Sequence, residues 1–163
     1  MSQKHSPPKT SPARRTLAVN RKAYHNYEVS ETYAAGVVLT GTEVKSLRAG
    51  TFSISQSFAR ISNGEVWLHG MTIQPYEQGN RYNHEPDRPR KLLLKRLEIN
   101  KLIGKTQMDR MTLIPLKIYF ERCWVKVDLG LCRSKQLVDK RETIKTRDAK
   151  REIDRAIKHH VSK

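Results

Sequence analysis

The sequence predicts a mainly β fold: an OB-like closed antiparallel barrel with short peripheral helices and a basic C-terminal tail. Three observations support this prediction. Short stretches of alternating apolar and polar residues recur through the middle of the 163-residue chain. Turn residues separate these stretches, and closing such a sheet into a barrel removes its exposed edges. Positive charge gathers at both ends, so we expect a disordered basic arm over 1–19, the barrel over 20–132 and the tail over 133–163.

The first half of the barrel region predicts one helix and a hairpin among several strands. Thr42 can cap a short helix that Gly50 would end. Asn63-Gly64 is a strong signal for a tight hairpin turn. The expected strands here are 24–29, 35–39, 54–61, 66–68 and 72–74.

The second half predicts a long loop followed by a helix and a second hairpin. Residues 75–90 lack periodicity and are rich in Gly, Asn and Pro, which is typical of a surface loop. The apolar spacing of 97–103 predicts a helix that Gly104 ends. The remaining expected strands are 92–94, 112–120 and 123–131, the last two joined at Glu121-Arg122.

Composition argues against a membrane-spanning protein, a secreted protein and a metal-binding protein. No apolar run approaches the roughly 18 residues of a membrane span, and the N-terminal stretch lacks the apolar core of a signal peptide. Cys123 and Cys132 form no metal-ligand spacing, so we expect reduced packing thiols. The sequence thus predicts a cytoplasmic protein without metal or cofactor.

The basic tail indicates a polyanionic partner. Residues 133–163 hold eleven Lys or Arg against five acids, and the whole chain has a net charge of +16. The tail has few aliphatic residues, and burying them cannot offset the conformational entropy that is lost on ordering. We therefore expect the tail to be disordered when free. A nucleic acid is the simplest partner, and Ile153 and Ile157 lie on a narrow stripe of a helix that binding would order. A frayed, solubilising tail is the alternative.

Three further segments combine cations with aromatic or amide side chains. In the loop 77–91, arginines suit phosphates, whereas Tyr82 and His84 suit stacking on unpaired bases. Lys45 and Arg48 share one face of the expected helix. The stretch Asn20–Tyr24 supplies an amide, two cations and an aromatic ring where the arm meets the barrel. For the loop and the helix, the alternative is a solvated surface.

Catalysis is not predicted. His84 lies near Glu85 and Asp87, which is a conceivable acid–base group for RNA cleavage. The chain has no Walker loop, nucleophile elbow or metal-ligand spacing. We therefore expect a binding protein rather than an enzyme.

Four motifs are specific enough to resemble a known family. The stretches 41–50 (GTEVKSLRAG), 75–81 (PYEQGNR), 90–94 (RKLLL) and 139–145 (DKRETIK) closely resemble the bacterial SmpB, or SsrA-binding protein, family of trans-translation factors. The resemblance implies an OB-like barrel that binds the tRNA-like domain of transfer-messenger RNA (tmRNA) and delivers it to stalled ribosomes. It also implies a monomer without membrane contact, whose tail enters the empty mRNA channel and reaches the decoding centre. Elongation factor Tu would be an indirect partner through aminoacylated tmRNA.

The motifs and the local patterns together give the predicted site residues. For RNA binding these are Asn20, Arg21, Lys22, Tyr24, Lys45, Arg48, Asn80, Arg81, Tyr82, His84, Arg90, Lys91 and Leu93. For the ribosome-binding tail they are Arg133, Lys135, Asp139, Lys140, Arg141, Lys145, Ile153 and Ile157.

The chain departs from the usual family pattern at three places. Ala34 stands where the family commonly has an acid, and Arg133-Ser134-Lys135 replaces Gly-Lys-Lys before the tail. Val138 also stands where an aromatic residue or His is common. A contact made by that acid and a glycine hinge are therefore not expected here. The alternative functions are a structural ribosomal protein and a general RNA chaperone.

Overall fold

The structure is a computed structural model that describes residues 14–108 and 111–135. The predicted tail beyond residue 135 and the first thirteen residues lie outside the described part. Of residues 80–82 and 108, the backbone alone is described.

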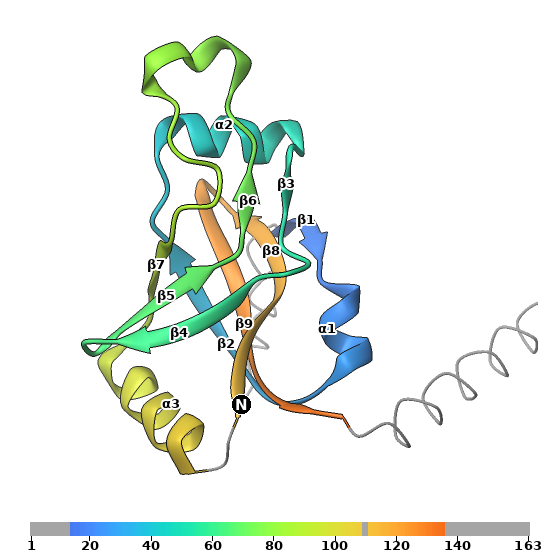
Figure 1. The fold of residues 1–163 in the computed structure, drawn as a ribbon, viewed down its shortest axis with the longest axis vertical. Helices are drawn as coiled ribbons and strands as arrows, with labels where there is room; N and C mark the ends of the chain where they lie inside the picture. Colours follow the sequence, from blue (N-terminus) through green and yellow to red (C-terminus); the bar gives the residue numbers. More distant parts are fainter. Residues whose placement is uncertain (1–13, 109–110, 136–163) are drawn as a thin grey trace, which may run out of the picture.

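The described part is mainly β, as predicted, and its centre is a closed ring of six antiparallel strands (Figure 1). The ring runs β8–β4–β5–β7–β2–β9 and closes because β9 also pairs with β8, while β1 pairs with β8 alongside it. Strands β3 and β6 form a separate two-stranded sheet. The strands are β1 Arg14–Val19, β2 Tyr27–Val37, β3 Phe52–Ser53, β4 Phe58–Ser62, β5 Glu65–His69, β6 Thr72–Ile73, β7 Arg90–Leu93, β8 Thr112–Glu121 and β9 Trp124–Ser134.

Helices lie at both ends and along one side of the ring (Figure 1). The helix α2 (Gly41–Ala49) and the helix α3 (Arg96–Met108) lie at opposite ends, whereas α1 (Arg21–Asn26) runs along the side. Between β6 and β7 the chain forms a 3-10 helix, η1 (Glu77–Tyr82). No helix of the described residues is long and apolar enough to cross a membrane.

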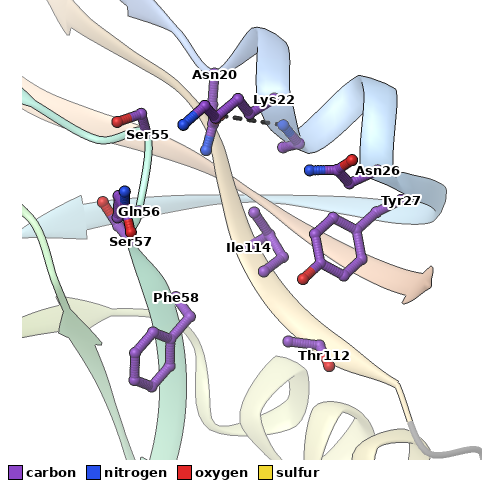
Figure 2. A pocket seen from close by; sticks show the side chains of 11 residues that line it. Asn20, Lys22, Asn26, Tyr27, Ser55, Gln56, Ser57, Phe58, Thr112 and Ile114 are labelled. Atoms are coloured by element: carbon purple, nitrogen blue, oxygen red, sulfur yellow. Dashed lines mark hydrogen bonds between the residues drawn. The ribbon is translucent and has the colours of Figure 1, made fainter. Parts of the chain in front are cut away.

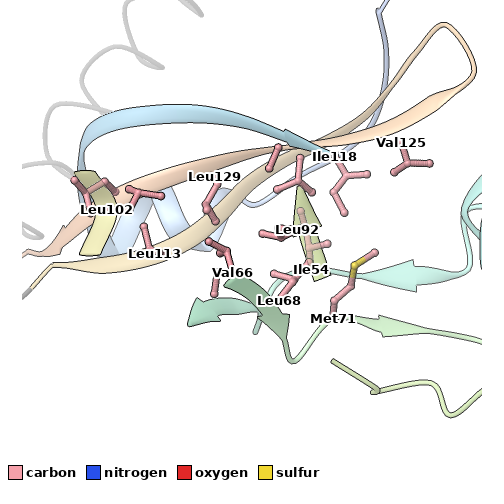
Figure 3. Packing of buried hydrophobic residues seen from close by; sticks show 14 of the residues in the cluster. Ile54, Val66, Leu68, Met71, Leu92, Leu102, Leu113, Ile118, Val125 and Leu129 are labelled. Atoms are coloured by element: carbon pink, nitrogen blue, oxygen red, sulfur yellow. The ribbon is translucent and has the colours of Figure 1, made fainter. Parts of the chain in front are cut away.

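The core fills the ring (Figure 3). Inward-facing residues such as Leu68, Leu129 and Ile118 are fully buried, and Leu47 of α2 and Leu102 of α3 join the same cluster. A smaller cluster lies outside the ring, where Ala23 of α1 packs against Ile114, Leu116 and Cys132. The short helix α1 is therefore held by burial against β8 and β9.

Local signals in the sequence are confirmed where backbone geometry decides them. Asn63 and Gly64 both have positive φ, 52° and 72°, which the tight turn of the β4–β5 hairpin requires. Gly50 ends α2 with a φ of 81°. The N-cap is Thr40 rather than Thr42, since Thr40 and Glu43 form a capping box.

Several predicted boundaries are wrong. Residues 14–19 form β1 instead of a disordered arm, and residues 21–26 are helical where the pattern predicted a strand from 24. The predicted strands 24–29 and 35–39 merge into β2, while the predicted strand 54–61 breaks, and β4 begins at Phe58. Pairing with β8 and β9 decides the outcome for β1 and β2, whereas the Asn20 cap and the burial of Ala23 decide it for α1.

The second half shows two further differences. Helix α3 continues past Gly104 to Met108, and β9 continues to Ser134. Arg133 pairs with Glu28, so the first residues of the predicted tail belong to the sheet. Cys132 packs in the second cluster and burial raises the pKa of its thiol to about 11, whereas Cys123 is exposed rather than packed.

Candidate RNA-binding surface

Two cations of α2, which the sequence predicted to share one face of this helix, lie at one end of the barrel (Figure 1). Lys45 and Arg48 are exposed, whereas Leu47 on the same helix is fully buried. The Lys45 ammonium lies 5.1 Å from the centre of the Tyr76 ring, and the Arg48 guanidinium lies 5.6 Å from that of Phe120. Each cation thus contacts an aromatic face and remains accessible to a phosphate.

A buried ion-pair network lies under these cations. Glu43 of α2 accepts hydrogen bonds from Arg88 Nε at 2.9 Å and from Arg90 Nε at 3.0 Å. Its other carboxylate oxygen accepts from the Thr40 backbone N–H at 2.9 Å. The Arg90 guanidinium also donates to the carbonyls of Pro86, Arg88 and Met71. The network therefore joins α2 to the C-terminal end of the loop between β6 and β7 and to Met71, just before β6.

The electrostatics of the network favour the charged pair. Burial raises the pKa of Glu43, but the hydrogen bonds from Arg88 and Thr40 and the charge of Arg90 outweigh it, so the pKa lies below its usual value. Burial lowers the pKa of Arg90, and Glu43 offsets part of that change. Arg90 is 0% exposed and its donors are engaged inside the protein, so it positions the loop. This corrects the predicted direct contact of Arg90 with RNA.

The loop contains a 3-10 helix that its composition did not predict. Asn83 closes it by accepting from the Tyr76 N–H at 3.0 Å and donating to the Tyr76 carbonyl at 2.9 Å. A Cβ at Gly79 would lie 2.5 Å from Asn83 Oδ1, so a larger residue there would displace the Asn83 amide. The η1 backbone of Asn80–Tyr82 is thereby carried above α2 (Figure 1), and His84 is exposed beside it.

Strand β7 supplies a cation and an exposed leucine. Lys91 forms an ion pair with Glu65, and both side chains are partly exposed. Leu92 is 1% exposed in the core, whereas Leu93 is 53% exposed and lies over Gly36 of β2. Because neighbouring strand residues face opposite sides, Leu93 points away from the core.

We expect Leu93→Ala to leave the fold nearly unchanged, at a cost of about 0.5–1 kcal/mol, because the side chain is half exposed. RNA binding should weaken if this face contacts RNA. The control is Leu92→Ala, which should cost about 2–5 kcal/mol because it empties a core position. Urea unfolding and RNA titration of both variants check the expectation. A large loss of stability in Leu93→Ala would show that the leucine serves packing instead.

Asn20 occupies a buried position, which differs from the predicted surface contact. It is 4% exposed, and its Nδ2 donates to the carbonyls of Ile54 and Pro115, each at 3.1 Å. Its Oδ1 accepts from the Ala23 N–H at 3.1 Å and so caps α1. Asn20 therefore fixes α1 to the barrel, while Arg21, Lys22 and Tyr24 on the helix are exposed.

The end of β9 lies beside α1. The Lys135 N–H donates to the Asn26 carbonyl at 3.0 Å, and its ammonium donates to the Tyr24 carbonyl at 3.2 Å. Arg133 is exposed on the same strand. The predicted tail residues Asp139, Lys140, Arg141, Lys145, Ile153 and Ile157 lie outside the described part of the chain.

The predicted residues thus divide into two groups rather than forming one surface. One group lies at the α2 end, with the loop and β7, and the other lies along the side of the barrel at α1 and the end of β9 (Figure 1). Within residues 14–108 and 111–135, no three His, Cys, Asp or Glu residues gather as a metal site would require.

Sequence reasoning missed an aromatic pair on the β4–β5 hairpin, of which Phe58 is exposed and His69 is partly buried. Phe58 stacks on His69 with ring centres 5.5 Å apart, and the Arg60 guanidinium lies 5.8 Å from the Phe58 ring centre. Phe58 and His69 are opposite each other in the hairpin register. The register follows from the Asn63-Gly64 turn, so counting outward from that turn would have found the pair. Trp124, 75% exposed at the start of β9, was also missed.

Comparison with known proteins agrees with this architecture. The family model described as SmpB protein matches residues 17–159. An SsrA-binding protein from Carboxydothermus hydrogenoformans is 56% identical over 142 residues, covering 87% of this chain and 95% of that protein. One from Shouchella clausii is 54% identical over 147 residues, covering 90% and 94%.

A solved structure titled "tmRNA-SmpB: a journey to the center of the bacterial ribosome" is 52% identical in sequence and matches with a TM-score of 0.61. The match covers 74% of this chain and 85% of the solved one. A family match over most of the chain, relatives above half identity and a similar fold lead to one conclusion: this chain belongs to the SmpB protein family.

Proposed function

We propose that the protein is a non-enzymatic adaptor that binds the tRNA-like domain of tmRNA and brings it to stalled ribosomes for trans-translation. Its membership of the SmpB family carries this proposal, because the relatives are named SsrA-binding proteins and the matching structure concerns tmRNA, SmpB and the ribosome. The exposed cations at the α2 end support it, since RNA affinity rests largely on phosphate contacts.

Each part of the chain has a separate role in this proposal. The α2 end, with Lys45, Arg48, the η1 loop and β7, binds the tRNA-like domain. The α1 side and the end of β9 face the ribosome, where residues 136–163 enter the empty mRNA channel. The protein acts as a monomer in the cytoplasm and meets elongation factor Tu only through aminoacylated tmRNA.

The salt dependence of RNA binding tests the electrostatic part of the proposal. If about five phosphates are contacted, the logarithm of the affinity should fall with the logarithm of salt concentration at a slope of about −3.5 to −4.5. Lys45→Ala should weaken binding of the tRNA-like domain and make this slope shallower by about 0.7–0.9. Lys101→Ala is the matched control, because Lys101 is exposed on α3 at the opposite end of the barrel.

Filter binding at several salt concentrations measures both the affinity and the slope of its salt dependence. Equal losses of RNA affinity in Lys45→Ala and Lys101→Ala would show that binding depends on net charge rather than on the α2 end. Sequencing the RNA that copurifies from cells addresses the identity of the partner. One small stable RNA is expected, whereas copurification with non-stalled ribosomes would indicate a structural ribosomal protein.

A further inference from the structure

A pocket of about 440 Å³ lies on the outside of the barrel, between α1 and residues 55–58 (Figure 2). Thr112 and Ile114 of β8 form its floor, and Asn26 and Tyr27 form the wall beneath α1. We call it the α1 pocket. Its volume falls in the range of about 300–1,000 Å³ that is usual for small-ligand sites.

One polar atom of the pocket has no partner within the described part of the protein. Ser57 is 4% exposed, and its hydroxyl makes no hydrogen bond there. Buried polar atoms are nearly always paired, so each exception needs an explanation. Ser57 is one of the residues that line the pocket, but its hydroxyl oxygen has almost no accessible surface, so the exposed side chains of the lining make the polar contacts with a ligand.

The rest of the lining suits a flat, polar-edged ligand. The Gln56 amide offers a donor and an acceptor, as the edge of a nucleobase requires, and Asn26, whose Oδ1 bonds to the His25 ring, offers its Nδ2 donor. The rings of Tyr27 and Phe58 offer apolar surface to a base, and Phe58 already stacks on His69 and lies 5.8 Å from the Arg60 guanidinium. Lys22 of α1 lines the same pocket and is exposed, which suits a phosphate.

Buried contacts hold the two walls in place. Asn20 hydrogen bonds to Ile54 on one side and to Pro115 of β8 on the other, while capping α1. Gly70 has a φ of 67°, and a Cβ there would lie 2.8 Å from the Gln56 carbonyl oxygen. The segment 55–57 is therefore packed tightly from behind, so the pocket is formed before any ligand arrives.

We propose that the α1 pocket binds one unpaired nucleotide of a structured RNA. The base lies against the aromatic rings, its edge hydrogen bonds to the amides of Asn26 and Gln56, and Lys22 contacts the phosphate. RNA is favoured over other small ligands because proteins recognise structured RNA chiefly at unpaired, stacked bases, and this chain has a net charge of +16. The inference rests on the proposed function, and the nucleotide comes from tmRNA or from ribosomal RNA.

Chemical probing of base edges tests this proposal with the full-length protein. One arm uses the tRNA-like domain, and the other uses ribosomes, so the arm in which protection occurs identifies the source. The wild type should protect one unpaired base from modification. Gln56→Ala and Phe58→Ala should restore its reactivity and lower affinity for that RNA, by at least about fivefold for the lost ring.

Gln107→Ala is the matched control for Gln56→Ala, because Gln107 is an exposed glutamine on α3 outside this pocket. It should keep the protection intact. Thermal unfolding of all variants confirms that the fold is retained, since Gln56 and Phe58 are exposed.

The possible failures are distinguishable. If the variants bind RNA and ribosomes like the wild type and no protection depends on Gln56 or Phe58 in either arm, the pocket proposal is overturned and the proposed function stands. If the wild type binds neither RNA nor ribosomes, the proposed function fails first and the pocket proposal fails with it.

Discussion

Glu43→Gln is expected to lower the free energy of unfolding by about 3–5 kcal/mol, because it leaves a buried arginine without its counter-charge. Arg90 is 0% exposed and pairs with the Glu43 carboxylate at 2.9 Å. Arg88 donates to the same carboxylate, so one substitution removes the ion pairs that join α2 to the C-terminal end of the loop between β6 and β7. RNA binding should fall as well, because the loop backbone of η1 loses its support.

The matched control is Glu65→Gln. Glu65 also pairs with a cation, Lys91, but both side chains are well exposed, so its loss should cost about 1 kcal/mol or less. Urea unfolding of the two variants measures the difference. Similar losses of unfolding free energy in both variants would show that burial does not decide how much the Glu43 ion pairs contribute to stability.

The pH dependence of stability provides a second test of the ion pairs of Glu43 with Arg88 and Arg90. The pKa of Glu43 is lower in the folded protein than its usual value, because the hydrogen bonds and the charges outweigh burial. The ionised Glu43 carboxylate therefore makes its full contribution to stability above its pKa in the unfolded chain, about 4.3. That contribution is lost as the pH falls through the lower pKa of Glu43 in the folded protein. The wild type should lose more stability than Glu43→Gln on acidification below about pH 4.

Truncation after Lys135 is expected to abolish tagging of stalled products while leaving the barrel folded and able to bind the tRNA-like domain. The described strand pairing ends at Ser134 with Tyr27, and Lys135 bonds to Asn26. The cut thus removes none of these contacts. It removes residues 136–163, nine cations and five acids, which we propose occupy the mRNA channel.

A cut after Leu131 gives an instructive contrast. It removes the buried Cys132 and the pairing of β9 with Tyr27, Glu28 and Val29, so it should also weaken the fold. Circular dichroism and RNA titration separate the two truncations, and a tagging assay on stalled ribosomes measures function. If the chain cut after Lys135 still supports tagging, the proposed role of the tail is wrong.

Two full-length variants refine the role of the tail. The triple change Asp139→Ala, Lys140→Ala, Arg141→Ala should reproduce the failure of tagging. Ile153→Pro would cost about 3 kcal/mol or more of helix stability. Normal tagging by Ile153→Pro would indicate that the tail acts as a string of cations rather than as a helix.

The sequence by itself determined the features that depend on neighbouring residues. Asn63-Gly64 specified its hairpin and Gly50 ended α2, because positive φ values are cheap only for a few residue types. The spacing of α2 placed Lys45 and Arg48 on the surface, and the charge pattern and motifs pointed to an RNA-binding family.

The tertiary structure alone decided the features that depend on distant residues. Three consecutive leucines, 92–94, carry no periodicity, so only the β7 pairing register shows that Leu92 is buried and Leu93 exposed. Arg90 and Asn20 read as surface contacts in the sequence, yet their partners, Glu43 and the carbonyls of Ile54 and Pro115, lie 34 or more positions away. Burial and strand pairing arise when the ring closes, and local preferences contain no information about that closure.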